Sequence, residues 1–150
     1  MELSKLFAGR EAEIAAMQGR LSQLAAAEGI PLTVRTRTYN SRRAQELGKW
    51  AELRGAGDPF HRAVYQAYFV EGSNIALVDE LMRIADSVGL PTDEVRAVLA
   101  ERRFAVAVDA DWQRAGKLRI TAVPTHLCNG KRLAGFSDYV DFVSLIGKGS

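Results

Sequence analysis

The chain has 150 residues, of which 47% are hydrophobic and 25% charged, and its formal net charge is +2 at pH 7. This balance excludes a disordered chain, and so small a charge indicates no nucleic-acid partner. Cys128 is the single cysteine, which excludes the class of disulfide-stapled secreted proteins. A chain of this length is expected to form a single domain. Because no apolar run has the length of a signal peptide or a membrane span, we expect the protein in the cytoplasm, without a membrane partner.

Apolar residues at helical spacing dominate the chain up to about residue 117. Residues 11–28 form the first such stretch, which is expected to end at Gly29. Its apolar stripe consists of Ile14, Met17, Leu21 and Leu24. Residues 32–39 alternate polar and apolar side chains and predict an extended connector or edge strand. Four arginines in and after this connector are interpreted as a solvated face: Arg35, Arg37, Arg42 and Arg43.

Several further helices are predicted before the first strand. Asn40 and Ser41 are expected to cap a helix that reaches Leu53. After the break at residues 55–57, Asp58 is expected to cap the next helix, with a proline at its first position. The remaining helices are predicted at residues 77–88, from Pro91 onward, and through Phe104 to about Lys117. Aromatic residues at helical spacing are expected in the core: Trp50, Trp112, Tyr65, Tyr68 and Phe69.

Strands are predicted only near the C-terminus, at residues 121–128 and 132–136. The Asn129-Gly130 pair between them favours a tight hairpin, and Ser137 is expected to cap a final helix. A two-stranded hairpin is only marginally stable alone, so it must pack on helices or pair with further strands. Its unpaired edge predicts self-association, and a homodimer through this edge is expected.

Several motifs occur in an order that resembles one family. They are Tyr39-Asn40-Ser41-Arg42 followed by Ala44-Gln45-Glu46-Leu47, the aromatic stretch from Phe60 to Phe69, and Thr121-Ala122-Val123-Pro124-Thr125. This order resembles DsbA-like thioredoxin-fold proteins, in the branch of FrnE-type oxidoreductases and 2-hydroxychromene-2-carboxylate isomerases. The resemblance covers roughly residues 3 to 146. It implies an α/β, mostly helical fold: a helical insertion over about residues 1–117, then the C-terminal β-β-α part of a thioredoxin fold over about residues 118–147.

The resemblance also implies a first β-α-β unit with a C-x-x-C pair, or a serine in the isomerase branch, and this unit has no counterpart here. Thiol–disulfide exchange by a dithiol needs an attacking and a resolving sulfur, and one cysteine supplies only one. We therefore expect a thiol–disulfide oxidoreductase homologue that is truncated or catalytically incomplete, with no catalytic residue in this chain. The alternatives are a glutathione-dependent isomerase or transferase relative and a non-catalytic interaction module. The resemblance implies a thiol or disulfide protein, or glutathione, as partner, and no other cofactor.

Six candidate substrate-binding residues follow from the resemblance. A cis peptide bond at Pro124 would expose the backbone of Val123, beside Thr125, to a bound peptide or to glutathione; the alternative is a structural bend. Ser137 and Asp138 match a position that holds the glutamyl end of glutathione, but we favour the alternative that Ser137 simply caps the last helix. Asn40 matches a substrate-contacting asparagine of the isomerase branch, and the alternative is that it caps the helix after it.

His126 and Cys128 lie two residues apart on a predicted strand, so they are expected on the same face. Such a pair could activate a thiol or supply two metal ligands. No third ligand is suggested by the spacing, and we interpret Cys128 as a buried, inert cysteine, with no metal site. Asp109 and Asp111 face different ways on a helix and predict no acid–base pair.

Overall fold

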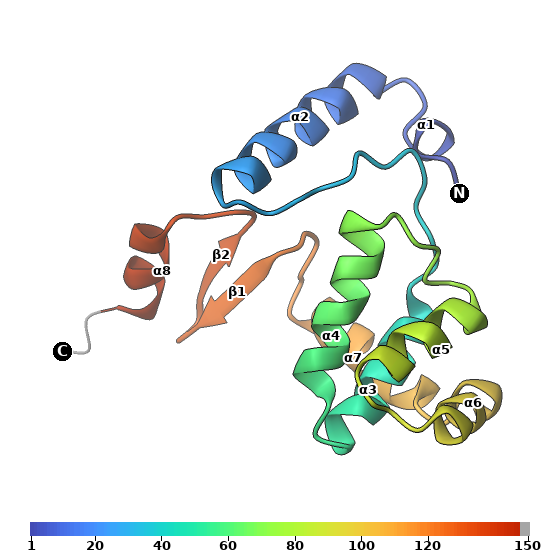
Figure 1. Cartoon of the computed structure of the whole chain (residues 1–150). Coiled ribbons are helices and arrows are strands. Elements are labelled where there is room, and N and C mark those ends of the chain that lie inside the picture. Colours follow the sequence, from blue (N-terminus) through green and yellow to red (C-terminus); the bar gives the residue numbers. More distant parts are fainter. Residues whose placement is uncertain (148–150) are drawn as a thin grey trace. The chain divides into compact units, whose positions relative to one another are not determined.

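The computed structural model describes residues 1–147 and divides into two compact units, residues 1–108 and residues 109–150 (Figure 1). The first unit is helical, and the second holds a β-hairpin and the last helix. The elements of the first unit are α1 (Leu3–Leu6), α2 (Glu11–Ala27), α3 (Arg42–Leu53), α4 (Gly57–Tyr65), the π-helix η1 (Gln66–Val70), α5 (Val78–Ser87) and α6 (Thr92–Glu101). Helix α7 (Ala105–Lys117) begins in the first unit, and β1 (Thr125–Cys128), β2 (Lys131–Ala134) and α8 (Tyr139–Ile146) follow it.

The core of the first unit lies among α3, α4, α5 and α6, which Figure 1 draws from cyan to yellow. Its most deeply buried large side chains are Leu47, Phe60, Leu81 and Ile84. Trp50 packs in this core, as predicted. The prediction is wrong for Trp112 and Tyr65, which are 56% and 53% exposed. Helical spacing places a residue on a stripe but does not say whether that stripe faces the core.

Helix α2 begins and ends where the sequence predicts, and Gly29 adopts a left-handed φ of 67° just after it. Each of its residues nevertheless keeps part of its surface exposed, and Met17 and Leu21 are 58% and 47% exposed. Of the two alternatives for residues 32–39, the connector is found: within the described chain this segment forms one isolated bridge, between Glu2 and Arg37, and no strand.

The connector after α2 is instead held on the π-helix η1. The Thr33 amide donates to the Phe69 carbonyl at 2.9 Å, and the Thr33 hydroxyl donates to the Val70 carbonyl. The Arg35 guanidinium lies 4.3 Å from the centroid of the Tyr68 ring and 4.7 Å from that of Phe69. Reading Arg35 as part of a solvated face is therefore wrong, because its charge is used in cation–π contacts.

The start of α4 also differs from the prediction. Ala56 occupies the N-cap position, and no side chain caps this end, so Asp58 lies inside the first turn. Its carboxylate there still suits the positive end of the helix dipole. Gly57 allows the close approach of α3, because a Cβ at this position would lie 2.9 Å from the Cγ of Glu52.

The second unit is built on an antiparallel hairpin whose register pairs Thr125 with Ala134 and Cys128 with Lys131. Asn129 and Gly130 both have positive φ, as a two-residue hairpin turn requires. The strands are four residues each, shorter than the predicted 121–128 and 132–136. Residues 122–124 form a bend before β1, and the Thr125 hydroxyl donates to the Ala122 carbonyl across it at 2.6 Å.

Helix α8 packs on one face of this hairpin. Leu145 is buried, and the Phe142 ring meets the His126 ring edge-on, with centroids 4.7 Å apart. On the outer side of the hairpin, the Arg132 guanidinium donates to the Arg119 carbonyl at 2.8 Å and to the Leu118 carbonyl, just after α7 ends. Over the described residues, no helix combines the length and the apolar character that crossing a bilayer requires.

Candidate functional site

The bend at residues 122–125 is the best-formed candidate site in the second unit. The Val123–Pro124 peptide bond is cis. The Thr125 hydroxyl holds the bend from one side through the Ala122 carbonyl, and the Gly135 amide donates to the Pro124 carbonyl at 2.8 Å from the other. Between these two anchors Val123 is 87% exposed. The bend therefore exposes Ala122, Val123 and Pro124 to solvent on a backbone that is held at both ends.

The hairpin register brings a second predicted segment beside this bend. Because Thr125 pairs with Ala134, the chain that leaves β2 passes the bend and continues directly into Ser137 and Asp138. Five of the six predicted site residues thus come from the end of the hairpin opposite its tight turn. The antiparallel pairing alone brings these five residues to the same end of the hairpin.

Asp138, and not Ser137, caps α8. Its Oδ1 accepts a hydrogen bond from the Asp141 amide at 3.0 Å, and the Asp141 carboxylate accepts one from the Asp138 amide at 3.4 Å. This reciprocal pair is a capping box, and it corrects the assignment of the cap to Ser137, which lies one residue outside. One carboxylate oxygen of Asp138 is thereby used by the helix itself.

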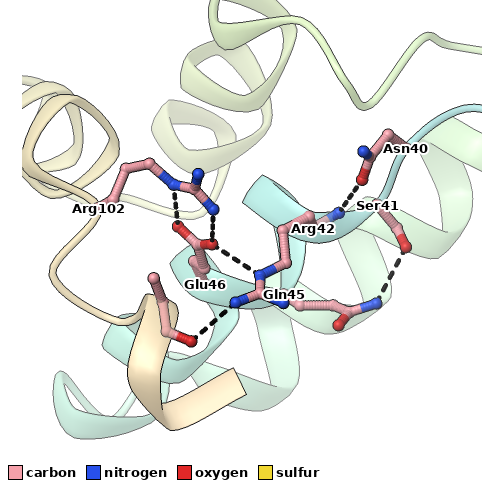
Figure 2. A network of polar contacts seen from close by, with 7 residues as sticks. Asn40, Ser41, Arg42, Gln45, Glu46 and Arg102 are labelled. Atoms are coloured by element: carbon pink, nitrogen blue, oxygen red, sulfur yellow. Dashed lines mark hydrogen bonds and ion pairs between the residues drawn. The ribbon is translucent and has the colours of Figure 1, made fainter. Parts of the chain in front are cut away.

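Asn40, the sixth predicted residue, belongs to the first unit. Its side-chain oxygen accepts a hydrogen bond from the Arg42 amide at 2.9 Å (Figure 2). The Gln45 amide group also donates to the Ser41 hydroxyl at 3.0 Å in the first turn of α3. Ser41 therefore occupies the N-cap position of α3 without the expected side-chain cap, and Asn40, one residue before it, satisfies the first amide of the helix.

A buried carboxylate that sequence reasoning missed lies one turn further along α3. Glu46 is 1% exposed, and its carboxylate accepts from Arg42 Nε at 2.9 Å and from Arg102 Nη2 at 2.5 Å (Figure 2). Arg42 also donates to the Ala105 carbonyl at 2.9 Å, at the start of α7. Arg42 is therefore no part of a solvated face, since its side chain is only 18% exposed.

The hydrogen bond from Arg102, helped by that from Arg42, holds the pKa of Glu46 below its ordinary value, although burial opposes this shift. The carboxylate is thus kept charged and fully partnered, which suits a structural tie between α3 and the segment from Arg102 to Ala105. The i,i+4 spacing of Arg42 and Glu46 was the one signal in the sequence. The second partner of Glu46, Arg102, lies 56 residues further along the chain, so no local sequence pattern indicates this pair.

His126 and Cys128 lie on the hairpin face that carries α8. The His126 ring contacts Phe142, and Cys128 is a free thiol that is half-buried rather than buried as predicted. Within residues 1–147, no group of three metal-ligating side chains comes together. We therefore interpret His126 and Cys128 as side chains that pack between the hairpin and α8.

A cavity of about 420 Å³ lies in the first unit between α1, α2 and residues 34–36. Apolar side chains of Leu3, Phe7, Ile14 and Val34 form much of its lining. None of the six predicted site residues belongs to this lining, so the cavity and the candidate site are separate features.

Comparison with known proteins assigns the family. The family model described as the DSBA-like thioredoxin domain matches residues 3–147. This chain belongs to the DSBA-like thioredoxin domain family. The predicted DsbA-like fold, mostly helical with a small sheet, is therefore confirmed.

A solved structure supports the same assignment for this DsbA-like chain. It is that of a probable DsbA oxidoreductase from Streptomyces coelicolor, with 29% sequence identity and a TM-score of 0.73. The match covers 83% of this chain and 56% of the other, so the DsbA-like chain spans little more than half of that relative. No curated protein matches the chain.

Proposed function

We propose that this chain forms the substrate-facing part of a FrnE-type, DsbA-like thiol–disulfide oxidoreductase and is catalytically incomplete by itself. Family membership supports the oxidoreductase class, and the match to just over half of a DsbA oxidoreductase supports incompleteness. The single cysteine supports it further. The C-x-x-C unit that the resemblance implies would be supplied by polypeptide outside this sequence.

The observation that carries the proposal is the braced bend at Val123. A protein substrate with a disulfide must be held with one sulfur in line for attack, and an exposed residue on a rigid backbone can hold the flanking peptide. In our proposal the Val123 backbone pairs with an extended stretch of the substrate, as the family resemblance implies. Pro124 and Thr125 fix the position of this residue.

The chemistry explains why this chain needs a second component. A thiolate attacks one sulfur of the substrate disulfide, a mixed disulfide forms, and the other substrate sulfur leaves as a thiolate. A second thiol then attacks the mixed disulfide and releases the reduced substrate. Cys128, half-buried in β1 and the single cysteine of the chain, supplies no such pair.

Insulin reduction by dithiothreitol tests this proposal. The chain as given is compared with a version extended by the codons upstream of Met1. We expect acceleration by the extended version only. In that version Thr125→Val should reduce the rate, because it removes the hydrogen bond to the Ala122 carbonyl, while the nearby exposed Thr121→Val serves as the matched control. If neither version accelerates insulin reduction, the proposed oxidoreductase activity is wrong.

A glutathione-dependent isomerase or transferase relative is the alternative within the same resemblance, with Asn40, Ser137 and Asp138 as ligand contacts. Calorimetry with glutathione separates it from the oxidoreductase. Asp138→Asn is the useful variant, because asparagine still caps a helix but removes the charge. Loss of glutathione binding in this variant would favour the isomerase or transferase alternative.

A cytoplasmic location stays a prediction from the sequence.

A non-catalytic interaction module is the second alternative. It is favoured by one observation: the second unit exposes apolar side chains on α8 next to a two-stranded sheet.

A further inference from the structure

Helix α7 is followed by a left-handed residue that is not a glycine. The Ile120 amide donates to the Ala115 carbonyl at 3.0 Å, and the Arg119 amide donates to the Gly116 carbonyl at 2.9 Å. These two hydrogen bonds form a Schellman motif, in which the left-handed position is usually glycine. Arg119 holds that position with φ of 52°, where a side chain is unfavourable because its Cβ approaches the following carbonyl oxygen. Such a conformation persists when contacts from outside the helix stabilise it.

The stabilising contact comes from Arg132 on β2. Its Nη1 donates to the Arg119 carbonyl at 2.8 Å, and its Nη2 donates to the Leu118 carbonyl. These two carbonyls belong to the two peptide planes on either side of the Arg119 Cα, so one planar guanidinium fixes both backbone dihedrals of that residue. A side chain of the hairpin therefore sets the direction in which the chain leaves α7.

The chain that leaves α7 enters the substrate-facing bend almost at once. Two residues stand between Arg119 and the bend at residues 122–124, and the first of them, Ile120, is already bonded to α7. Little free chain therefore lies between the end of the helix and the bend. The other end of the bend is held by the amide of Gly135, the residue directly after β2. Strand β2 thus holds the approach to the bend through Arg132 and its exit through the residue that follows the strand.

We propose that Arg132 is a positioning residue of the bend, which fixes the place of the Val123 backbone through Arg119. The inference rests on the proposed function, in which this backbone pairs with an extended stretch of a protein substrate. Such pairing needs the Val123 backbone at the spacing of neighbouring strands, about 4.8 Å from the substrate chain. A rotation at Arg119 would move it away from that distance. A small disulfide has no peptide backbone to pair, so Arg132 matters for protein substrates and not for small ones.

Nuclear magnetic resonance of the chain as given tests whether Arg132 holds the bend. We expect the backbone order parameter of the Val123 amide to fall from about 0.85, the value of a rigid backbone, to below about 0.6 in Arg132→Met. Arg132→Lys should fall nearly as far, because a single ammonium nitrogen keeps the charge but does not reproduce the planar fork of the guanidinium. Lys131→Met is the matched control, since it removes a positive charge from the same strand and leaves the bonds of Arg132 in place.

Three results would overturn the proposal. The first is an order parameter at Val123 that stays near about 0.85 in Arg132→Met. The second is an Arg132→Lys chain that behaves like the unmodified one, because the charge alone would then suffice. The third is an equal fall at Val123 and throughout β1 and β2, because Arg132 would then hold the whole hairpin and not the bend.

Kinetics of the version extended upstream of Met1 tests the consequence for the substrate. We expect Arg132→Met to raise the KM for insulin about tenfold with little change in kcat, because binding to the substrate chain is lost. Both constants for hydroxyethyl disulfide should stay unchanged, and Lys131→Met should alter neither substrate. An unchanged KM for insulin, or equal losses with both substrates, would overturn the proposal. The order parameter needs no redox activity, so it decides the role of Arg132 even if the extended version is inactive and the proposed function fails.

Discussion

Arg102 donates two hydrogen bonds to the carboxylate of Glu46 while its own backbone is left-handed, with φ of 51°. The distances are 3.2 Å from Nε and 2.5 Å from Nη2. The left-handed residue ends α6, and its side chain turns back to α3 (Figure 2). One ion pair therefore closes a helix and ties it to another.

Removing the charge of Glu46 should destabilise the first unit. Glu46→Gln leaves Arg42 and Arg102 facing a neutral amide, and we expect a loss of about 3 kcal/mol in the free energy of unfolding, the low end for a broken buried pair because Arg102 is half exposed. Urea unfolding measures this change. Glu52→Gln is the control, since its side chain is 63% exposed, and a comparable loss there would contradict the role of burial.

Acid should remove the contribution of Glu46. Its pKa is lowered in the folded protein by the hydrogen bonds from Arg102 and Arg42, so folding stabilises the charged form. This stabilisation is complete above the ordinary value of 4.5 and is lost as the pH falls through the lowered folded pKa. Unfolding curves of the unmodified protein and Glu46→Gln should therefore converge in acid. A difference that stays constant below pH 4.5 would contradict the assignment.

Glycine at position 102 should be better tolerated than alanine. Both changes remove the ion pair, but glycine adopts the left-handed region freely, whereas alanine pays about 1 kcal/mol there. Comparing the midpoints of urea unfolding for Arg102→Gly and Arg102→Ala isolates the backbone term. The order would be reversed if position 102 behaved as an ordinary helical residue.

Position 138 and not position 137 should govern the stability of α8. Asp138→Ala removes the capping box and should cost about 1 kcal/mol, while Asp138→Ser should restore most of it. Ser137→Ala should change the unfolding free energy little. Thermal unfolding of these three variants gives the ranking, and equal losses at both positions would show that the cap is shared.

The helices were predictable because their signals are local. The stripe of α2 and the glycine after it place that helix within one residue, and Leu47 and Trp50 recur at the spacing that buries α3. Caps were less predictable, since Asp58 lies two residues after the cap position of its helix and Ser137 lies one residue before that of α8, although both are good capping residues.

Long-range relationships were not predictable in the same way. The pair of Glu46 and Arg102 spans 56 residues, and neither neighbourhood signals the other. The bend just before β1 holds a hydrogen bond from the Thr125 hydroxyl to the Ala122 carbonyl, which a pattern of apolar residues does not record. The five candidate site residues of the second unit came together only through the hairpin register.

The hydrogen bonds from Arg132 to the carbonyls of Leu118 and Arg119 make the hairpin a cap for the helix before it. These carbonyls follow the C-terminal end of α7, where the helix dipole is negative and a guanidinium is favourable. Opening β2 withdraws this cap, so the last turn of α7 loses its closure when the strands part. Amide hydrogens of the hairpin and of that last turn are therefore expected to exchange with solvent as one cooperative unit, which makes β2 the element that sets how long the end of α7 stays folded.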